Sequence, residues 1–404
     1  MAEIVRRQVY LDLINHCLGK EAIIVLTGQR RVGKSYLLRQ LREDACLEDG
    51  ANVIYIDKEK HEFDAIGDYR QLNAYIATRW QAGRHNYVLI DEAQDIVGFE
   101  RSVRSWRTEP RTEVVITGSN ARMLSGELST LLGGRYREIY VYPLSYNEFL
   151  TFHDLVDGDE ALSLYLQYGG MPGLRRVGLD GDDARQYLTD IYHTILLKDV
   201  ILRNQIRNTA FLENLVAFVA DSSGKAISAN SISRYMKSEG QSVTSTAVIN
   251  YLRYLTDAFI VRRVGRYDIH GKRLLGTLDR YYFEDCGLRN AIVGGSREGD
   301  VEKVMEGVVC QHLLRSGWQV HVGQLHNAEI DFVCSDVTGR RAYVQVTYLM
   351  VDPQTRDREL GNLHRIGDQY PKFVVSMTPL LTRSDADGIT HLGLRTFLST
   401  PFRV

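Results

Sequence analysis

The residues from Gly28 to Ser35 have the types and spacing needed to bind a polyphosphate. The run GQRRVGKS fits the pattern G-x-x-x-x-G-K-[ST]. Glycines let a loop curl so that several backbone N–H groups point at one anion, and the first turn of the following helix adds its own. Lys34 can then reach the β- and γ-phosphates of ATP, and the Ser35 hydroxyl can bind Mg²⁺. An ordinary glycine turn before a helix is the alternative. The predicted nucleotide contacts are Gly28, Gln29, Arg30, Arg31, Val32, Gly33, Lys34, Ser35 and Tyr36.

Two carboxylates, Asp91 and Glu92, follow a second apolar run that begins at Tyr87. A buried strand beside the strand that precedes Gly28 would bring Asp91 to the same edge of the sheet as the glycine loop. Asp91 could hold Mg²⁺ through water, and Glu92 could polarise the water that attacks the terminal phosphate. A strand that simply ends in two solvent-facing acids is the alternative. The glycine loop nearby favours the metal and catalytic roles.

A third apolar run ends in Thr117-Gly118-Ser119-Asn120. A polar side chain at this tip can form a hydrogen bond with the γ-phosphate or with the attacking water. Asn120 is a better candidate for this sensing role than Ser119. The alternative is a plain turn, because Gly-Ser-Asn is good turn chemistry.

Arg135 comes just before the last strand of this series. An arginine there could project from one subunit into the nucleotide site of its neighbour and stabilise charge that develops on the γ-phosphate. A solvated arginine, or one paired with Glu138, is the alternative, which the residues alone favour.

Such a site needs several strands that end at one edge of a sheet. Strands are expected near 23–26, 52–57, 87–92, 113–120 and 137–142, and helices near 1–20, 33–44, 68–82 and 99–108. Apolar strands that alternate with helices predict a mostly parallel sheet covered on both faces. Ligands then gather at the carboxyl ends of the strands. The fold class predicted for this part is therefore α/β, with the parallel sheet of a P-loop NTPase.

Residues 151–204 indicate a helical lid or connector, and residues 205–280 change character. Helices near 211–219, 229–236 and 244–255, followed by strands at 260–264 and 272–275, are typical of a winged helix-turn-helix. The segment 225–273 holds nine Lys or Arg and three acids, a local net charge of +6. This predicts DNA binding, with a winged helix used only for protein packing as the alternative. The predicted DNA contacts are Arg262, Arg263, Arg266, Lys272 and Arg273, and Ser242, Thr244, Ser245 and Thr246 suit phosphate contacts.

Residues 281–404 indicate a second, smaller α/β domain. A glutamate on a helix (Glu306), an aspartate on a strand (Asp331) and a strand carrying Gln345-Val346-Thr347 have the layout of a restriction-endonuclease-like metal site. In active sites of this kind, acids hold Mg²⁺ and a lysine positions or deprotonates water. Thr347 stands here in place of that lysine, and Lys372 is a weak substitute. We therefore expect a degenerate site that has lost cleavage, with an active nuclease as the alternative.

The length and composition of the chain exclude several classes of protein. A chain of 404 residues exceeds what one core normally serves, so two or three domains are expected. No run approaches 18 apolar residues and the N-terminus lacks the features of a secretory signal, so we expect no membrane contact. Five scattered cysteines without CxxC spacing argue against zinc and favour the cytoplasm.

Several short runs together resemble one family. They are the two ATP motifs, TGSN at 117, GRY at 134, YPLS at 142, YGGMP at 168, YL at 251, RYDI at 266, EIDF at 329 and YPK at 370. The family is that of prokaryotic AAA-type ATP-binding proteins with a C-terminal nuclease-like domain of unknown function. The resemblance implies an ATPase core at 1–150, a lid at 151–204, a winged helix at 205–280 and a nuclease-like domain at 281–404. It also implies a homo-oligomer, with Asn120 as sensor and Arg135 acting across subunits.

These observations predict a Mg²⁺-dependent ATPase whose nucleotide state changes its grip on DNA or on a protein partner. The first alternative is an ATP-dependent metal nuclease of a defence system. The second is a nucleotide-gated signalling or adaptor protein without DNA contact.

Overall fold

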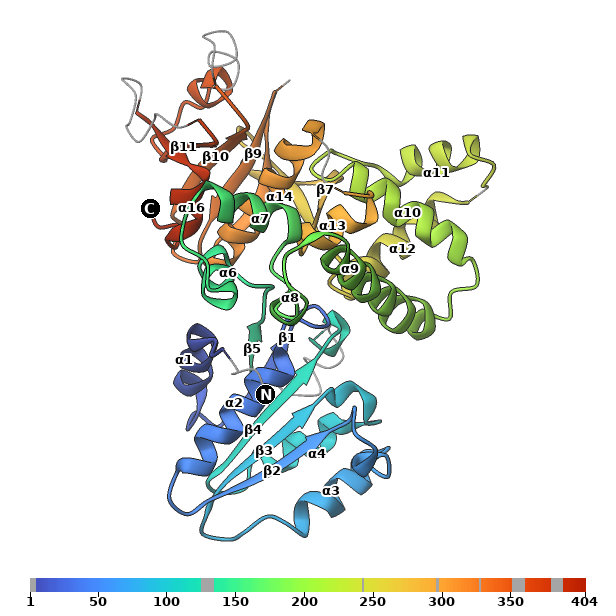
Figure 1. The fold of residues 1–404 in the computed structure, drawn as a ribbon, viewed down its shortest axis with the longest axis vertical. Coiled ribbons are helices and arrows are strands. Elements are labelled where there is room, and N and C mark those ends of the chain that lie inside the picture. Colours follow the sequence, from blue (N-terminus) through green and yellow to red (C-terminus); the bar gives the residue numbers. More distant parts are fainter. Residues whose placement is uncertain are drawn as a thin grey trace. The chain divides into compact units, whose positions relative to one another are not determined.

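The computed structural model describes residues 5–124, 134–241, 243–295, 298–326, 328–350, 360–378 and 388–404. The chain divides into two compact units. The first comprises Met1–Tyr142 with Asp257–Phe259, and the second comprises Pro143–Thr256 with Ile260–Val404. Figure 1 labels their helices and strands.

The first unit is built on a parallel sheet of five strands in the order β2-β3-β4-β1-β5. This confirms the predicted parallel α/β sheet. One detail of the prediction is wrong, because the strand that ends at Asp91 does not lie beside the strand before Gly28. Strand β4 lies between them and pairs with both, so the two carboxylates reach the loop across one intervening strand. The bounds are β1 Ile23–Thr27, β2 Ala51–Asp57, β3 His85–Asp91, β4 Thr112–Gly118 and β5 Tyr136–Tyr140.

Helices cover this sheet, and that explains why its inner strands are apolar along their length. All five residues of β1 and all seven of β4 are buried. On one face, alternate strand residues such as Val25 and Ile116 pack with Leu72 and Val103 from two helices. Asp68 begins one of these helices with a capping box to Gln71. The helices are α1 Gln8–Cys17, α2 Lys34–Leu47, α3 Tyr69–Ala77 and α4 Phe99–Trp106.

The second unit contains a seven-stranded sheet in the order β12-β11-β10-β9-β8-β6-β7. Its β6–β7 hairpin is antiparallel, and β6 pairs in parallel with β8. Strand β7 runs through residue 280, so the hairpin predicted as a wing shares one sheet with the strands predicted for the nuclease-like domain. The bounds are β6 Val261–Asp268, β7 Arg273–Phe283, β8 Gln319–Leu325, β9 Ala328–Ser335, β10 Arg341–Thr347, β11 Lys372–Ser376 and β12 Ile389–Gly393.

Two short helices, α11 and α12, precede β6 and β7 in the chain. Ser228 begins the first of them and accepts a hydrogen bond from the Ser231 N–H. Ser242 lies outside the described residues. The bounds are α6 Tyr146–His153, α7 Asp159–Tyr168, α8 Leu174–Val177, α9 Gly181–Ile195, the π-helical turns Leu196–Leu202, α10 Thr209–Asp221, α11 Ala229–Ser238, α12 Ser245–Asp257, α13 Cys286–Ile292, α14 Val301–Arg315 and α16 Leu394–Ser399.

The glycines of the YGGMP run meet the start of α13 at very short range. The Gly170 N–H donates to Asp285 Oδ2 at 2.6 Å, and Asp285 also accepts from the Leu288 N–H at 2.9 Å. A Cβ at Gly287 would lie 1.9 Å from the Tyr168 carbonyl oxygen. Only a residue without a side chain allows this approach, so the run has a packing role within the second unit.

Among the helices in the described ranges, we find none whose length and hydropathy would let it cross a membrane.

Candidate functional site

The glycine-rich loop connects β1 to α2 and adopts backbone angles that suit glycine. Gly28 has φ +138°, and a Cβ there would lie 2.2 Å from the Val141 carbonyl oxygen. Gly33 has φ +101° and begins α2 in the left-handed region. The loop therefore curls against the chain that follows β5, and the N–H groups of the first turn of α2 stay available at its mouth.

Lys34 lies beneath this loop. Its Nζ donates to the carbonyl oxygens of Gly28 at 2.8 Å and Gln29 at 2.9 Å, and only 3% of the residue is exposed. The buried Gln29 amide has no hydrogen-bond partner for its nitrogen or its oxygen within the part of the chain that the structure describes. Buried polar groups are normally paired, so an unpaired amide in this loop is consistent with a polar ligand. The loop therefore fits a polyphosphate.

Arg7 anchors the loop from the N-terminal segment, a role that the sequence patterns did not indicate. Its Nη1 donates to the carbonyl oxygens of Val32 at 2.9 Å and Tyr142 at 3.0 Å, and the residue is buried. A lone arginine before an amphipathic helix carries no signal for this contact, because the partners are backbone atoms far along the chain.

Asp91 lies at the carboxyl end of β3 and interacts with Ser35 and Thr117. The Ser35 hydroxyl forms a hydrogen bond with its carboxylate, so the two predicted Mg²⁺ ligands meet. Burial raises the pKa of Asp91 to about 6; hydrogen bonds from Thr117 and Ser35 oppose this, and the charge of Glu92 adds to it. A buried carboxylate beside a hydroxyl is suited to hard cations, so the pair fits Mg²⁺.

Thr117 links the two acidic residues and was missed as a site residue. Its Oγ1 donates to Asp91 Oδ1 at 2.6 Å and accepts from the Glu92 N–H at 2.9 Å. The side chain is fully buried at the end of β4, between β3 and β1. The sequence offered one clue, since Thr117 belongs to the TGSN run in which only Ser119 and Asn120 were weighed.

Glu92 has left-handed backbone angles, with φ +53°, and its carboxylate is held by two side chains. Glu92 Oε2 accepts from Ser119 Oγ at 3.2 Å and from the Gln94 amide. Burial acts to raise the pKa of Glu92, but the charges of Lys34 and Arg30 and these hydrogen bonds outweigh it and lower the pKa overall. Glu92 is therefore ionised at neutral pH and can accept a proton or orient water.

Asn120 lies at the carboxyl ends of the parallel strands, and Arg135 lies at their amino ends. Asn120 is buried and follows β4, the neighbour of β1, as predicted. Arg135 is exposed and precedes Tyr136, which pairs with Ile23 at the start of β1. The loop follows Thr27 at the other end of β1, roughly 13 Å away at about 3.3 Å per residue. Arg135 therefore does not reach the loop of its own chain.

Comparisons with known proteins agree with this geometry. A protein of Haemophilus influenzae, described as an uncharacterized protein, is 34% identical over 394 residues, which are 95% of this chain and 96% of the relative. This chain and the Haemophilus protein belong to one family. The uncharacterized protein MJ1544 of Methanocaldococcus jannaschii is 24% identical over 374 residues, 89% of this chain and 80% of that protein.

Family and structure comparisons give the class of the first unit. The description "AAA domain" matches residues 20–150, and a domain of unknown function, DUF8612, matches residues 159–298. The Walker-type ATPase PABY2304 of Pyrococcus abyssi has a similar fold, with a TM-score of 0.50 and 15% identity over 72% of this chain and 96% of that one. Residues 20–150 therefore form an AAA domain, with the fold of a P-loop ATPase.

Outside the AAA domain, the positive charge predicted for the wing is largely paired. Arg262 forms an ion pair with Glu284 at 2.8 Å, Arg263 with Asp279 at 2.7 Å, and Arg266 with Glu329 at 3.0 Å. The three acids lie outside the segment whose charge was counted, so the value of +6 overstates the positive surface. Lys272 and Arg273 are exposed, and so are Arg234, Lys237 and Arg253 on α11 and α12.

The three residues predicted for the nuclease-like site do come together, but around an arginine. Arg280 Nη1 lies 3.3 Å from both Glu306 Oε2 and Asp331 Oδ1. The Gln345 amide oxygen accepts from the Asp331 N–H at 3.3 Å. The Lys372 ammonium donates to the Ile366 carbonyl oxygen at 2.8 Å. Arg280 was not singled out in the sequence, because it lies on β7, outside the three elements of the expected layout.

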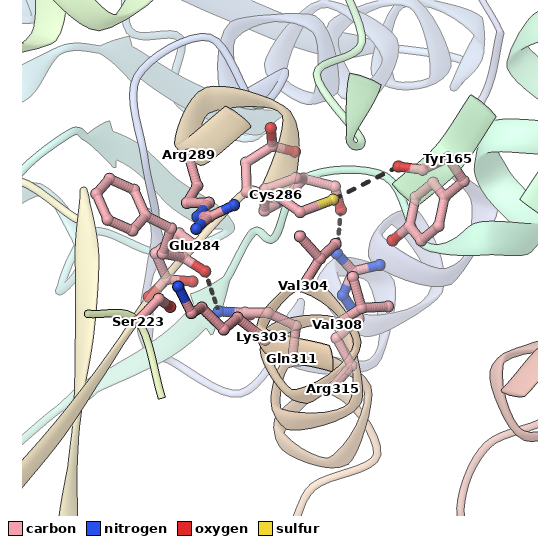
Figure 2. Close-up of a pocket in the computed structure, with 14 residues that line it drawn as sticks. Tyr165, Ser223, Glu284, Cys286, Arg289, Lys303, Val304, Val308, Gln311 and Arg315 are labelled. Atoms are coloured by element: carbon pink, nitrogen blue, oxygen red, sulfur yellow. Dashed lines mark hydrogen bonds between the residues drawn. The ribbon is translucent and has the colours of Figure 1, made fainter. Parts of the chain in front are cut away.

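A separate pocket lies in the second unit between β7, α13 and α14 (Figure 2). It contains Cys286, but burial raises the pKa of this thiol well above its usual value, so the thiol stays neutral. Arg289, another lining residue, forms an ion pair with Asp300 at 2.7 Å. Cys286 is therefore not an activated nucleophile, and we assign the pocket no catalytic role.

Proposed function

We propose that the AAA domain binds ATP and hydrolyses it with Mg²⁺. The observation that carries the proposal is the meeting of Lys34, Ser35, Asp91 and Glu92 at the carboxyl edge of one parallel sheet. Mg²⁺, when bound, would help to neutralise the negative charge that develops during phosphoryl transfer. Ser35 and Asp91 are the residues that would hold it.

The roles of the other residues follow from their contacts. On nucleotide binding, Lys34 exchanges its bonds to the loop carbonyls for bonds to the β- and γ-phosphates. Glu92 orients and polarises the attacking water, since its carboxylate is ionised and held by Ser119 and Gln94. Thr117 is a positioning residue that fixes Asp91 and the Glu92 backbone with one hydroxyl. Asn120 senses the γ-phosphate.

We further propose that Arg135 acts in the site of a neighbouring subunit of a homo-oligomer. Its exposure and its position at the amino end of β5 support an action in trans, because its own loop lies at the opposite end of β1. In that place its guanidinium would stabilise charge on the γ-phosphate.

We also propose that nucleotide state controls binding of DNA or of a protein partner through α11, α12 and the β6–β7 hairpin. Exposed Arg234, Lys237 and Arg253 support a DNA surface on the two helices rather than on the arginines that are paired with acids. DNA affinity should then fall with rising salt and with Arg234→Ala/Lys237→Ala. Arg262→Ala should matter less, because Glu284 already compensates its charge. Salt-insensitive binding, or none with ATP, with ADP and without nucleotide, would favour a protein partner.

The direct test of nucleotide binding uses Lys34→Ala with Lys20→Ala as a control. Lys20 is an exposed lysine of the same unit and lies before β1. Fluorescence titration with a labelled ADP should give similar affinities for the wild type and Lys20→Ala and a loss of at least about tenfold for Lys34→Ala. Equal affinity in all three proteins would contradict the assignment of the loop.

A further inference from the structure

A guanidinium occupies the centre of the carboxylate cluster in the second unit. Arg280, on β7, points its Nη1 at Glu306 of α14 and Asp331 of β9, and its Nη2 lies 2.6 Å from Glu329 Oε2. One nitrogen thus bonds the two oxygens that the predicted metal site needs. The oxygens converge on this nitrogen as they would converge on an ion.

Further donors engage the oxygen atoms of the cluster. Glu306 Oε2 accepts from the Tyr282 hydroxyl at 3.1 Å, and Asp331 Oδ2 accepts from the Val346 N–H at 2.9 Å. The second oxygen of Glu329 lies 3.0 Å from Arg266 Nη2. Mg²⁺ requires about six oxygens at about 2.0–2.1 Å in octahedral geometry. The cluster has no such set left, because cationic, hydroxyl and N–H donors already occupy five of its six carboxylate oxygens.

Gln345 does not complete a metal site either. Its amide oxygen accepts from the backbone N–H of Asp331 rather than pointing at the shared nitrogen. With Arg280 in place, the residues predicted as a degenerate nuclease site therefore do not fit a divalent cation, although they lie together.

We infer that Arg280 fills the place of a metal ion in this cluster, so that the wild-type protein holds Glu306, Glu329 and Asp331 together with a side chain and binds no divalent cation there. The contacts also tie the β6–β7 hairpin to β9 and α14, since Arg280 and Arg266 both come from the hairpin. Phosphodiester cleavage that depends on a metal at these residues is then excluded. This inference does not rest on ATP hydrolysis by the AAA domain.

The test counts Mn²⁺ ions bound per chain, by electron paramagnetic resonance of the full-length protein without nucleotide. Wild type and Asp331→Asn should bind the same number, because any ion in the AAA domain contributes equally to both. If Asp331→Asn bound one ion fewer than the wild type, the inference would be overturned. This comparison needs no change at Arg280 and so decides the question even if Arg280 variants do not fold.

Variants that remove the guanidinium of Arg280 provide a second test. Arg280→Ala, checked for folding by circular dichroism, should bind one additional Mn²⁺ that is lost again in Arg280→Ala/Glu306→Gln. Arg280→Lys keeps a cation in the cluster and should gain no ion. A folded Arg280→Ala protein that gains no Mn²⁺ would contradict the view that the side chain stands where an ion could bind.

Discussion

Two adjacent acids, Asp91 and Glu92, have pKa values that move in opposite directions. Burial dominates at Asp91 and raises its pKa to about 6, whereas the charges of Lys34 and Arg30 overcome burial at Glu92 and lower its pKa. Glu92 is therefore ready as a carboxylate before any nucleotide arrives. Asp91 is stabilised as a carboxylate only with help from hydroxyl donors or a cation, which suits a metal ligand.

Thr117 provides the sharpest prediction at this scale. Thr117→Val keeps the shape but removes the hydroxyl that joins Asp91 to the Glu92 backbone. A hydrogen bond to a charged group contributes about 1.5–3 kcal/mol, so we expect kcat to fall about 10- to 100-fold. The Mg²⁺ concentration for half-maximal ATPase rate should rise, while ADP affinity measured without Mg²⁺ stays unchanged.

The matched control is Thr117→Ser, which retains the hydroxyl and should retain most of the activity. If Thr117→Val and Thr117→Ser lost activity equally, the defect would lie in packing and not in the hydrogen bonds.

Residues of the site differ in how far the sequence could reveal them. Gly28, Lys34 and Ser35 form a local pattern, so spacing alone was enough to predict their place. Asp91 and Glu92 were found because they end an apolar strand. Arg7 and Arg280 act through partners far along the chain, and their spacing carries no signal. Thr117 belongs to the TGSN run, but its bonds to Asp91 and Glu92 became visible only when β3 and β4 were placed side by side.

At the scale of elements, the contact between the YGGMP run and α13 depends on Gly287. Gly287→Ala would place a Cβ 1.9 Å from the Tyr168 carbonyl oxygen, and such overpacking costs about 1–3 kcal/mol. Gly307→Ala in α14 meets nothing within 4 Å and should stabilise its helix by up to about 1 kcal/mol. Thermal unfolding should therefore move to lower temperature for Gly287→Ala and to higher temperature for Gly307→Ala. A Gly287→Ala protein as stable as the wild type would contradict the close contact.

Asp285, at the same contact, makes stability depend on pH. Burial raises its pKa from 3.8 to about 6 in spite of hydrogen bonds from backbone N–H groups. A raised pKa means that the folded state binds the proton more tightly, so stability is lost as pH rises from about 4 to about 6 and stays level above that. The free energy of unfolding of the wild type minus that of Asp285→Asn should fall by about 3 kcal/mol across this range, at about 1.4 kcal/mol per pKa unit. A difference that does not change with pH would show that Asp285 titrates normally.

The elements of the AAA domain were predictable because its inner strands are apolar along their length and its helices repeat apolar residues at helical spacing. The order of the strands in the sheet could not be predicted, since it depends on which strands pair with each other. The same limit applies to the second unit, where the β6–β7 hairpin was expected to stand apart. Strand β6 of the hairpin pairs with β8, which lies about 50 residues further along the chain, and the local spacing of residues does not predict such a pairing.

At the scale of the whole molecule, we expect each ATPase site to be shared between two subunits. Arg135→Ala lacks the guanidinium but has an intact loop, and Lys34→Ala lacks the loop lysine but has an intact Arg135. Each protein alone should be inactive, and a mixture should regain part of the ATPase rate because some sites combine an intact loop with a neighbour's arginine. An inactive mixture of proteins that still assemble would place Arg135 outside the site.

The most direct measurement of the central claim is ATP hydrolysis by Glu92→Gln. The change keeps the size of the side chain and its hydrogen bonds to Ser119 but removes the negative charge that polarises water. We expect ATP affinity close to that of the wild type and a turnover rate lower by about 10²–10⁴-fold. Hydrolysis at the wild-type rate by a Glu92→Gln protein would contradict the catalytic assignment on which the proposed function rests.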